Sequence, residues 1–152
     1  MCDTDEGTRE GGPPVECQLH EAYYRQLVRL AALLTGDPDA AEVVAGDALG
    51  ALPPWLAPGR AAADEVARYL QRQVLIRSRR IRPRTASAPG FARLPVVRAL
   101  QELPAHGREA IVLTHYLDLT RPQAAVVAGV SEAVLAKRLG RAMAMLHNRL
   151  PL

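Results

Sequence analysis

Aromatic residues, cysteines and long apolar runs are all scarce in this chain of 152 residues. Aromatic residues make up 4% of it and apolar residues 49%, so the core has to consist of Leu, Val and Ala, which suits helical packing. The two cysteines, Cys2 and Cys17, form no metal-binding spacing, so we expect free thiols. No apolar run approaches the ~18 residues of a membrane span, and the acidic start lacks a signal-peptide pattern. We therefore expect an all-α cytoplasmic protein with no metal, no cofactor and no membrane partner.

Charge is present but unevenly distributed. The net charge is +3, yet residues 1–66 hold twelve acids and four basic residues, whereas residues 67–152 hold fifteen basic residues and four acids. The two halves thus differ in sign, at −8 and +11. Such asymmetry points to a basic surface for an acidic polymer, beside a separate acidic part. Arginine supplies eighteen of the nineteen basic residues, which a GC-rich genome would also produce, so arginine content alone says little.

The most specific pattern is a helix-turn-helix in the last third. Two helices, 107–117 and 121–128, are expected to lead into a turn where Gly129 takes a positive φ and Ser131 caps a long final helix. Residues with apolar side chains recur on one side of that helix, and basic residues on the other, the geometry of a major-groove reader. We expect burial of Leu135, Leu139, Ala142 or Met143, Leu146 and Leu150, and DNA contact by Ser131, Lys137, Arg138 and Arg141. A salt bridge from Arg138 to Glu109 is the structural alternative.

The preceding part of the chain predicts three helices and a linker. Residues 1–14 have the composition of a disordered leader, and helices are expected over 15–35, 38–52 and 62–81. Gly36 ends the first helix, and Asp37 followed by Pro38 begins the second. Residues 83–95 read as a flexible linker, followed by a short helix over 96–103. Trp55 is expected to plug the core beneath its loop rather than face DNA.

Basic residues gather at the end of the third predicted helix. Phosphate contact is the functional interpretation of this cluster, and a solubilising helix end is the alternative. The cluster comprises Arg77, Arg79, Arg80 and Arg82, with Arg84 just beyond.

The order of these motifs resembles the extracytoplasmic-function (ECF) sigma factors of bacterial RNA polymerase, in particular short actinobacterial ones. Residues 24–37 resemble the start of the domain that binds core polymerase and the promoter −10 element, and residues 40–49 resemble its docking helix. Residues 69–82 resemble the helix that approaches −10 DNA, and residues 103–110 with 129–142 resemble the −35 domain. The resemblance implies an all-α fold of two small helical domains, over 15–82 and 96–152, and no enzymatic activity. The implied partners are promoter DNA, core RNA polymerase, which Glu42 and Asp47 would contact, and an anti-sigma factor or other regulator.

The docking helix departs from the family pattern. Val43 stands where a second acid is usual, Gly46 stands where Gln is usual, and Gly50 weakens the helix further. The alternative function is therefore a degenerate sigma-like protein that does not initiate transcription. Such a protein would act as a DNA-binding regulator or as a protein-interaction module.

Overall fold

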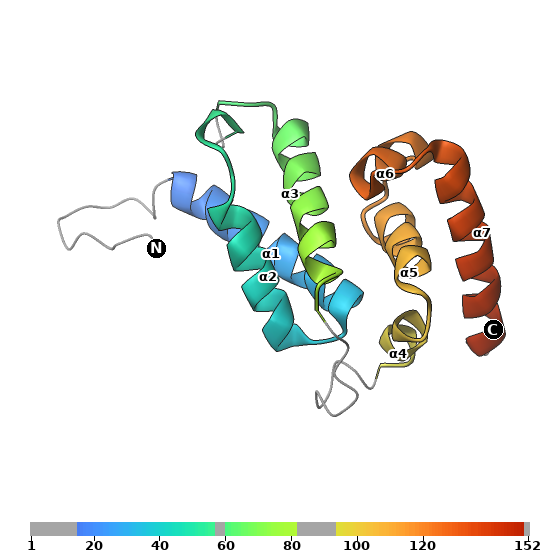
Figure 1. Cartoon of the computed structure of the whole chain (residues 1–152). Helices are drawn as coiled ribbons and strands as arrows, with labels where there is room; N and C mark the ends of the chain where they lie inside the picture. Colours follow the sequence, from blue (N-terminus) through green and yellow to red (C-terminus); the bar gives the residue numbers. More distant parts are fainter. Residues whose placement is uncertain (1–14, 57–59, 82–93, 151–152) are drawn as a thin grey trace.

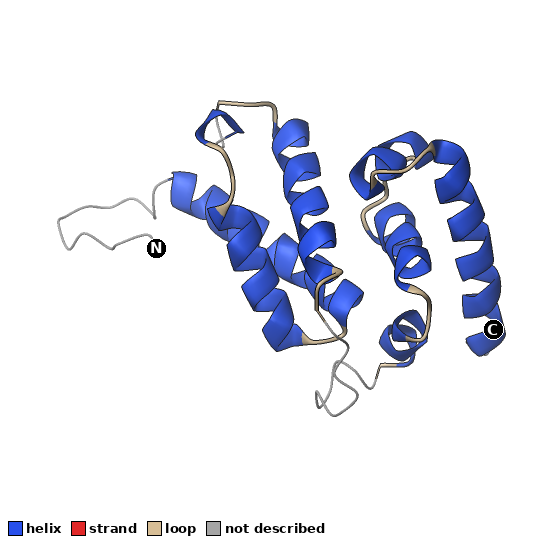
Figure 2. Cartoon of the chain, viewed as in Figure 1, coloured by secondary structure: helices blue, strands red, loops and turns tan. Residues whose placement is uncertain are grey.

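The computed structural model describes residues 15–56, 60–81 and 94–150, and the described chain forms seven α-helices with no β-sheet (Figure 1, Figure 2). The all-α prediction is confirmed. The predicted leader 1–14, Arg82, Arg84 and nearly all of the predicted linker lie outside the described residues. No helix of the described residues is both long and apolar enough to cross a bilayer.

The N-terminal half consists of α1 (Val15–Thr35), α2 (Pro38–Gly50), a 3₁₀ turn η1 (Pro54–Leu56) and α3 (Ala63–Ser78). Gly36 separates α1 from α2 with φ of +71°, a conformation that favours glycine. The Asp37 carboxylate accepts hydrogen bonds from the N–H groups of Asp39 (3.0 Å) and Ala40 (3.3 Å), which caps α2 as the sequence predicts. Helix α3 ends at Ser78, three residues earlier than predicted.

The C-terminal half consists of α4 (Pro95–Gln101), α5 (Ala105–Ile111), η3 (Val112–Tyr116), α6 (Arg121–Ala128) and α7 (Glu132–Arg149). The single helix predicted over 107–117 is thus two segments, because Val112–Tyr116 continue α5 with π-helical hydrogen bonding. Thr120 caps α6 in a reciprocal arrangement with Gln123, in which each side chain accepts a hydrogen bond from the other residue's N–H.

Burial in α2 and α3 follows helical periodicity. In α2, Ala41, Val44 and Ala48 are buried, and Leu52, just beyond the helix, is half-buried. In α3, Leu70 and Leu75 are buried on the inner face, while Tyr69 and Ile76 are half-buried. The core side chains are mainly Leu, Val and Ala, as the shortage of aromatic residues requires.

The two halves lie against each other. Helix α3 packs on α6, and α1 packs on α4, α5 and η3 (Figure 1). One hydrophobic cluster therefore runs through both halves, including Leu30 and Leu70 on one side and Leu113 and Leu135 on the other. This packing places the end of α3 beside α5. The end of α3 carries the arginines for which the sequence predicts contacts with DNA.

Candidate nucleic-acid and polymerase interface

The helix-turn-helix has the local geometry that its sequence predicts. Gly129 ends α6 with φ of +73°, and the N–H of Val130 donates to the carbonyl of Ala125 at 3.0 Å. The Ser131 hydroxyl then accepts a hydrogen bond from the N–H of Val134 at 3.2 Å and caps α7. These contacts fix the angle between α6 and α7, which is what a groove-reading helix needs.

Helix α7 has a buried side and a basic side. Leu135 and Ala142 are buried, Leu139 and Leu146 are half-buried, and Met143 is exposed, so the predicted stripe is only partly inside. Lys137 and Arg141 are exposed one turn apart, and Arg138 is half-buried beside them. Within the described part of the chain, no ion pair involves any of these three cations. Their positive charge is thus available to an anion outside the protein.

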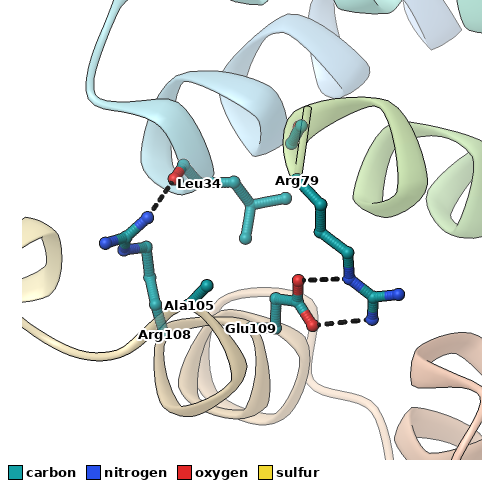
Figure 3. Close-up of a pocket in the computed structure, with 6 residues that line it drawn as sticks. Leu34, Arg79, Ala105, Arg108 and Glu109 are labelled. Carbon is teal, nitrogen blue, oxygen red and sulfur yellow. Dashed lines mark hydrogen bonds and ion pairs between the residues drawn. The ribbon is translucent and has the colours of Figure 1, made fainter. Parts of the chain in front are cut away.

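The arginines at the end of α3 lie in different environments. Arg80 is exposed, whereas Arg77 is half-buried and its Nε finds no hydrogen-bond acceptor among the described residues. Arg79 forms a two-pronged ion pair with Glu109 of α5, with Nε–Oε1 at 2.7 Å and Nη2–Oε2 at 2.9 Å (Figure 3). The hydrogen bond to Glu109 raises the pKa of Arg79, a side chain that is protonated in proteins in any case. The structure thus gives Arg79 an internal partner.

Glu109 is a buried carboxylate that links the two halves. Its side chain is 6% exposed, against 35% for Arg79, and Arg79 also donates to the carbonyl of Ala128 at 3.3 Å. His106 lies 3.8 Å from the same carboxylate. Glu109 therefore pairs with Arg79 across the halves and not with Arg138, the partner that the sequence offered as an alternative.

Arg108, next to Glu109, ties helix ends together. Its guanidinium donates to four backbone carbonyls, which belong to Leu34, Leu100, Gln101 and Leu103, at 2.8 to 3.0 Å. Burial lowers the pKa of Arg108, and Glu109 partly offsets this effect. Gln101 adds a bond from its Nε2 to the carbonyl of Leu33 at 2.9 Å. Figure 3 shows Arg108, Leu34 and Glu109 around a small cavity between α1, α3 and α5. Sequence reasoning predicted neither the bond from Arg108 to Leu34 nor the pair of Glu109 with Arg79, because these partners are seventy-four and thirty residues apart in the chain.

The outer face of α2 carries the residues predicted to meet the polymerase. Glu42, Asp47 and Gly46 are all exposed, while Val44 and Ala48 face the core. Val43, which stands where the resemblance predicts a second acid, is 60% exposed. This face is therefore open to a partner, with two carboxylates and one apolar side chain.

Trp55 lies at the surface, so the expectation that it plugs the core is wrong. Its exposed fraction is 68%, and the neighbouring Leu56 is the buried residue of η1. The 3₁₀ turn has only three residues and buries only one of its two consecutive apolar side chains. The buried one is the smaller, Leu56. Trp55 is therefore an exposed aromatic residue of η1.

Comparison with known proteins agrees with this geometry. Residues 93–146 match the family described as sigma-70, region 4. The structure of CnrH in complex with the cytosolic domain of CnrY is similar to this chain at a TM-score of 0.69 and 28% identity, covering 91% of this chain and 88% of that one. No curated protein matches the sequence.

A second solved structure shares the fold. The sigma factor RpoE in complex with the anti-sigma factor NepR from Bartonella quintana has a TM-score of 0.62 and 20% identity, covering 87% of this chain and 94% of that one. The comparisons thus assign residues 93–146 to sigma-70 region 4 and show that the helical fold of the chain is shared with both solved structures.

Proposed function

We propose that this chain is a sigma factor of the extracytoplasmic-function type, which directs RNA polymerase to its promoters through two separate surfaces. The observation that carries the proposal is the basic side of α7, held by the capped turn at Gly129 and Ser131 within the region 4 match. Lys137, Arg138 and Arg141 contact −35 DNA, and Ser131 donates its hydroxyl proton to a phosphate while its oxygen caps α7. The protein acts in the cytoplasm by binding and not as an enzyme.

The N-terminal half supplies the other surface in this proposal. The Arg77, Arg79, Arg80 and Arg82 cluster neutralises phosphates near the −10 element, and the exposed face of α2 docks on core polymerase through Glu42 and Asp47. Residues 15–82 then form the core-binding and −10 domain, and residues 96–152 form the −35 domain, joined by residues 83–95. The short actinobacterial type and the disordered leader stay predictions.

We also propose an anti-sigma factor as a regulatory partner. The support is that CnrH and RpoE were each solved with a bound partner, the cytosolic domain of CnrY and the anti-sigma factor NepR. The exposed apolar residues Val126, Val134 and Met143 on α6 and α7 offer such a partner additional contact area.

The −35 part of the proposal is tested with holoenzyme and a randomised promoter library. Arg141→Ala is expected to lower promoter affinity by about 1–3 kcal/mol at one base position if Arg141 contacts a base edge. If it contacts phosphate alone, affinity falls on every sequence and the salt slope decreases by about one. Arg98→Ala, on the exposed side of α4, is the matched control and leaves selection unchanged. Equal selection by both variants would contradict the assignment of α7.

The docking surface is tested by charge reversal. Glu42→Lys with Asp47→Lys is expected to weaken core binding at least ~10-fold, because like charges then face basic residues of the polymerase. Glu65→Lys, an exposed acid on the first turn of α3, is the control. Binding to purified core polymerase is measured by fluorescence anisotropy. Unchanged affinity of the double variant would remove α2 from the core interface.

A further inference from the structure

The contacts between the two halves hold the protein in one closed body. Apolar residues of α1 and α3 share a cluster with residues of α5, η3 and α6. Four polar contacts reinforce it, and each joins a side chain of one half to an acceptor of the other. They are Arg79 to Glu109, Arg79 to the Ala128 carbonyl, Arg108 to the Leu34 carbonyl and Gln101 to the Leu33 carbonyl.

A closed body of this size cannot contact both promoter elements at once. The −10 and −35 elements are about 25 base pairs apart by their names, which is about 85 Å of duplex at 3.4 Å per base pair. A compact chain of this length has a radius of gyration of about 15 Å, so it is roughly 40 Å across. Under the proposed function, on which this inference rests, the halves must therefore separate before both elements are bound.

Arg79 is the residue whose two uses conflict. In the closed body its Nε and Nη2 groups both donate to the Glu109 carboxylate, at 2.7 and 2.9 Å. A phosphate presents two oxygens in the same way, so carboxylate and phosphate are competing ligands for one guanidinium. Glu109 is also only 4% exposed as a residue, so in the closed state its carboxylate is shielded from water and its ion-pair partner is Arg79.

We propose that Glu109 is an internal competitor of promoter phosphate, which latches the free protein closed by holding Arg79. Separation of the halves frees the Arg79 cation for DNA and exposes Glu109 to water, where its charge is solvated. The latch and the DNA-bound form are then mutually exclusive. Removal of the Glu109 charge should therefore open the protein and strengthen its binding to DNA in one step.

The closure is measured by energy transfer between dyes on cysteines placed at Ala22 and His147, in a Cys2→Ser, Cys17→Ser background. Both dye positions are exposed, one on α1 and one on α7. Glu109→Gln is expected to shift the closed-to-open ratio at least ~10-fold toward the open form, because a buried ion pair loses one partner. Glu102→Gln is the matched control, since Glu102 pairs with Arg149 inside the C-terminal half. It should leave the ratio unchanged.

The competition is measured with a 30-base-pair duplex of random sequence and no polymerase. Glu109→Gln should bind it at least ~10-fold more tightly than the parent, whereas Arg79→Gln should open the protein without this gain, because the freed cation is missing. Arg79→Glu combined with Glu109→Arg restores the ion pair and should restore closure. This double variant still tests the latch if Glu109→Gln alone fails to fold.

Two results would overturn the proposal: a Glu109→Gln variant as closed as the parent, or one that opens with no gain in DNA affinity. A charge swap that stays open would count against it as well. Neither measurement uses polymerase, so failure of the chain to bind core would contradict the proposed function and leave the latch standing.

Discussion

At the scale of single residues, burial separates side chains that periodicity treats alike. Leu135 and Leu139 lie one turn apart on α7, yet Leu135 is 1% exposed and Leu139 is half-buried. Leu135→Ala should therefore destabilise the protein by about 2–5 kcal/mol, and Leu139→Ala by clearly less. Thermal and urea melts of the two variants check this order. Equal losses would mean that α7 is rotated from the described orientation.

Arg141 supplies the control for that experiment. Because its side chain is exposed and no ion pair of the described residues includes it, Arg141→Ala should melt close to the parent protein. A large loss of stability in Arg141→Ala would mean that the basic side of α7 has a structural function rather than a DNA-binding one.

At the scale of elements, caps and turns were the most predictable features. Gly36, Asp37, Gly129 and Ser131 each act where the sequence places them, because capping depends on residues within one turn of the chain. The π-helical segment Val112–Tyr116 and the exposure of Trp55 were not predictable from such local signals. Both depend on which neighbours remain available for packing once the helices have assembled.

Two glycines test this local account in opposite directions. Gly129 has φ of +73°, so Gly129→Ala should destabilise the protein by about 1–2 kcal/mol through backbone strain at the turn. Gly46 lies inside α2, where an added Cβ would meet no atom within 4 Å, so Gly46→Ala should stabilise the protein by about 0.5–1 kcal/mol. Chemical denaturation measures both. Changes of the same sign in the two variants would contradict the assigned backbone geometry.

At the scale of the whole molecule, sequence reasoning predicted the two helical halves but not their contact. Arg79 and Glu109 are thirty residues apart, and no periodicity or motif relates them. The same holds for Arg108 and Leu34, which are seventy-four residues apart. Sequence patterns therefore predicted Arg79 as a DNA contact from its charge alone. The fold adds that this charge already has a partner in the closed protein.

The salt dependence of DNA binding follows from this arrangement. Each phosphate that an arginine neutralises should add about 0.9 to the slope of log affinity against log salt. Because the latch occupies Arg79 in the closed protein, the free chain should show a slope smaller by about one than the Glu109→Gln variant. Titrations of the random duplex at several salt concentrations measure the two slopes. Identical slopes would mean that opening releases no additional cation to DNA.

Reconstitution with purified bacterial core RNA polymerase tests the central claim most directly. The chain is mixed with core enzyme, passed over a size-exclusion column at low salt, and assayed for transcription on genomic fragments. We expect co-elution with core and initiation at discrete sites that core alone does not use, with both effects lost in the Glu42→Lys, Asp47→Lys variant. Failure to co-elute, together with a clear footprint from the isolated protein, would contradict a sigma factor function and indicate a DNA-binding regulator.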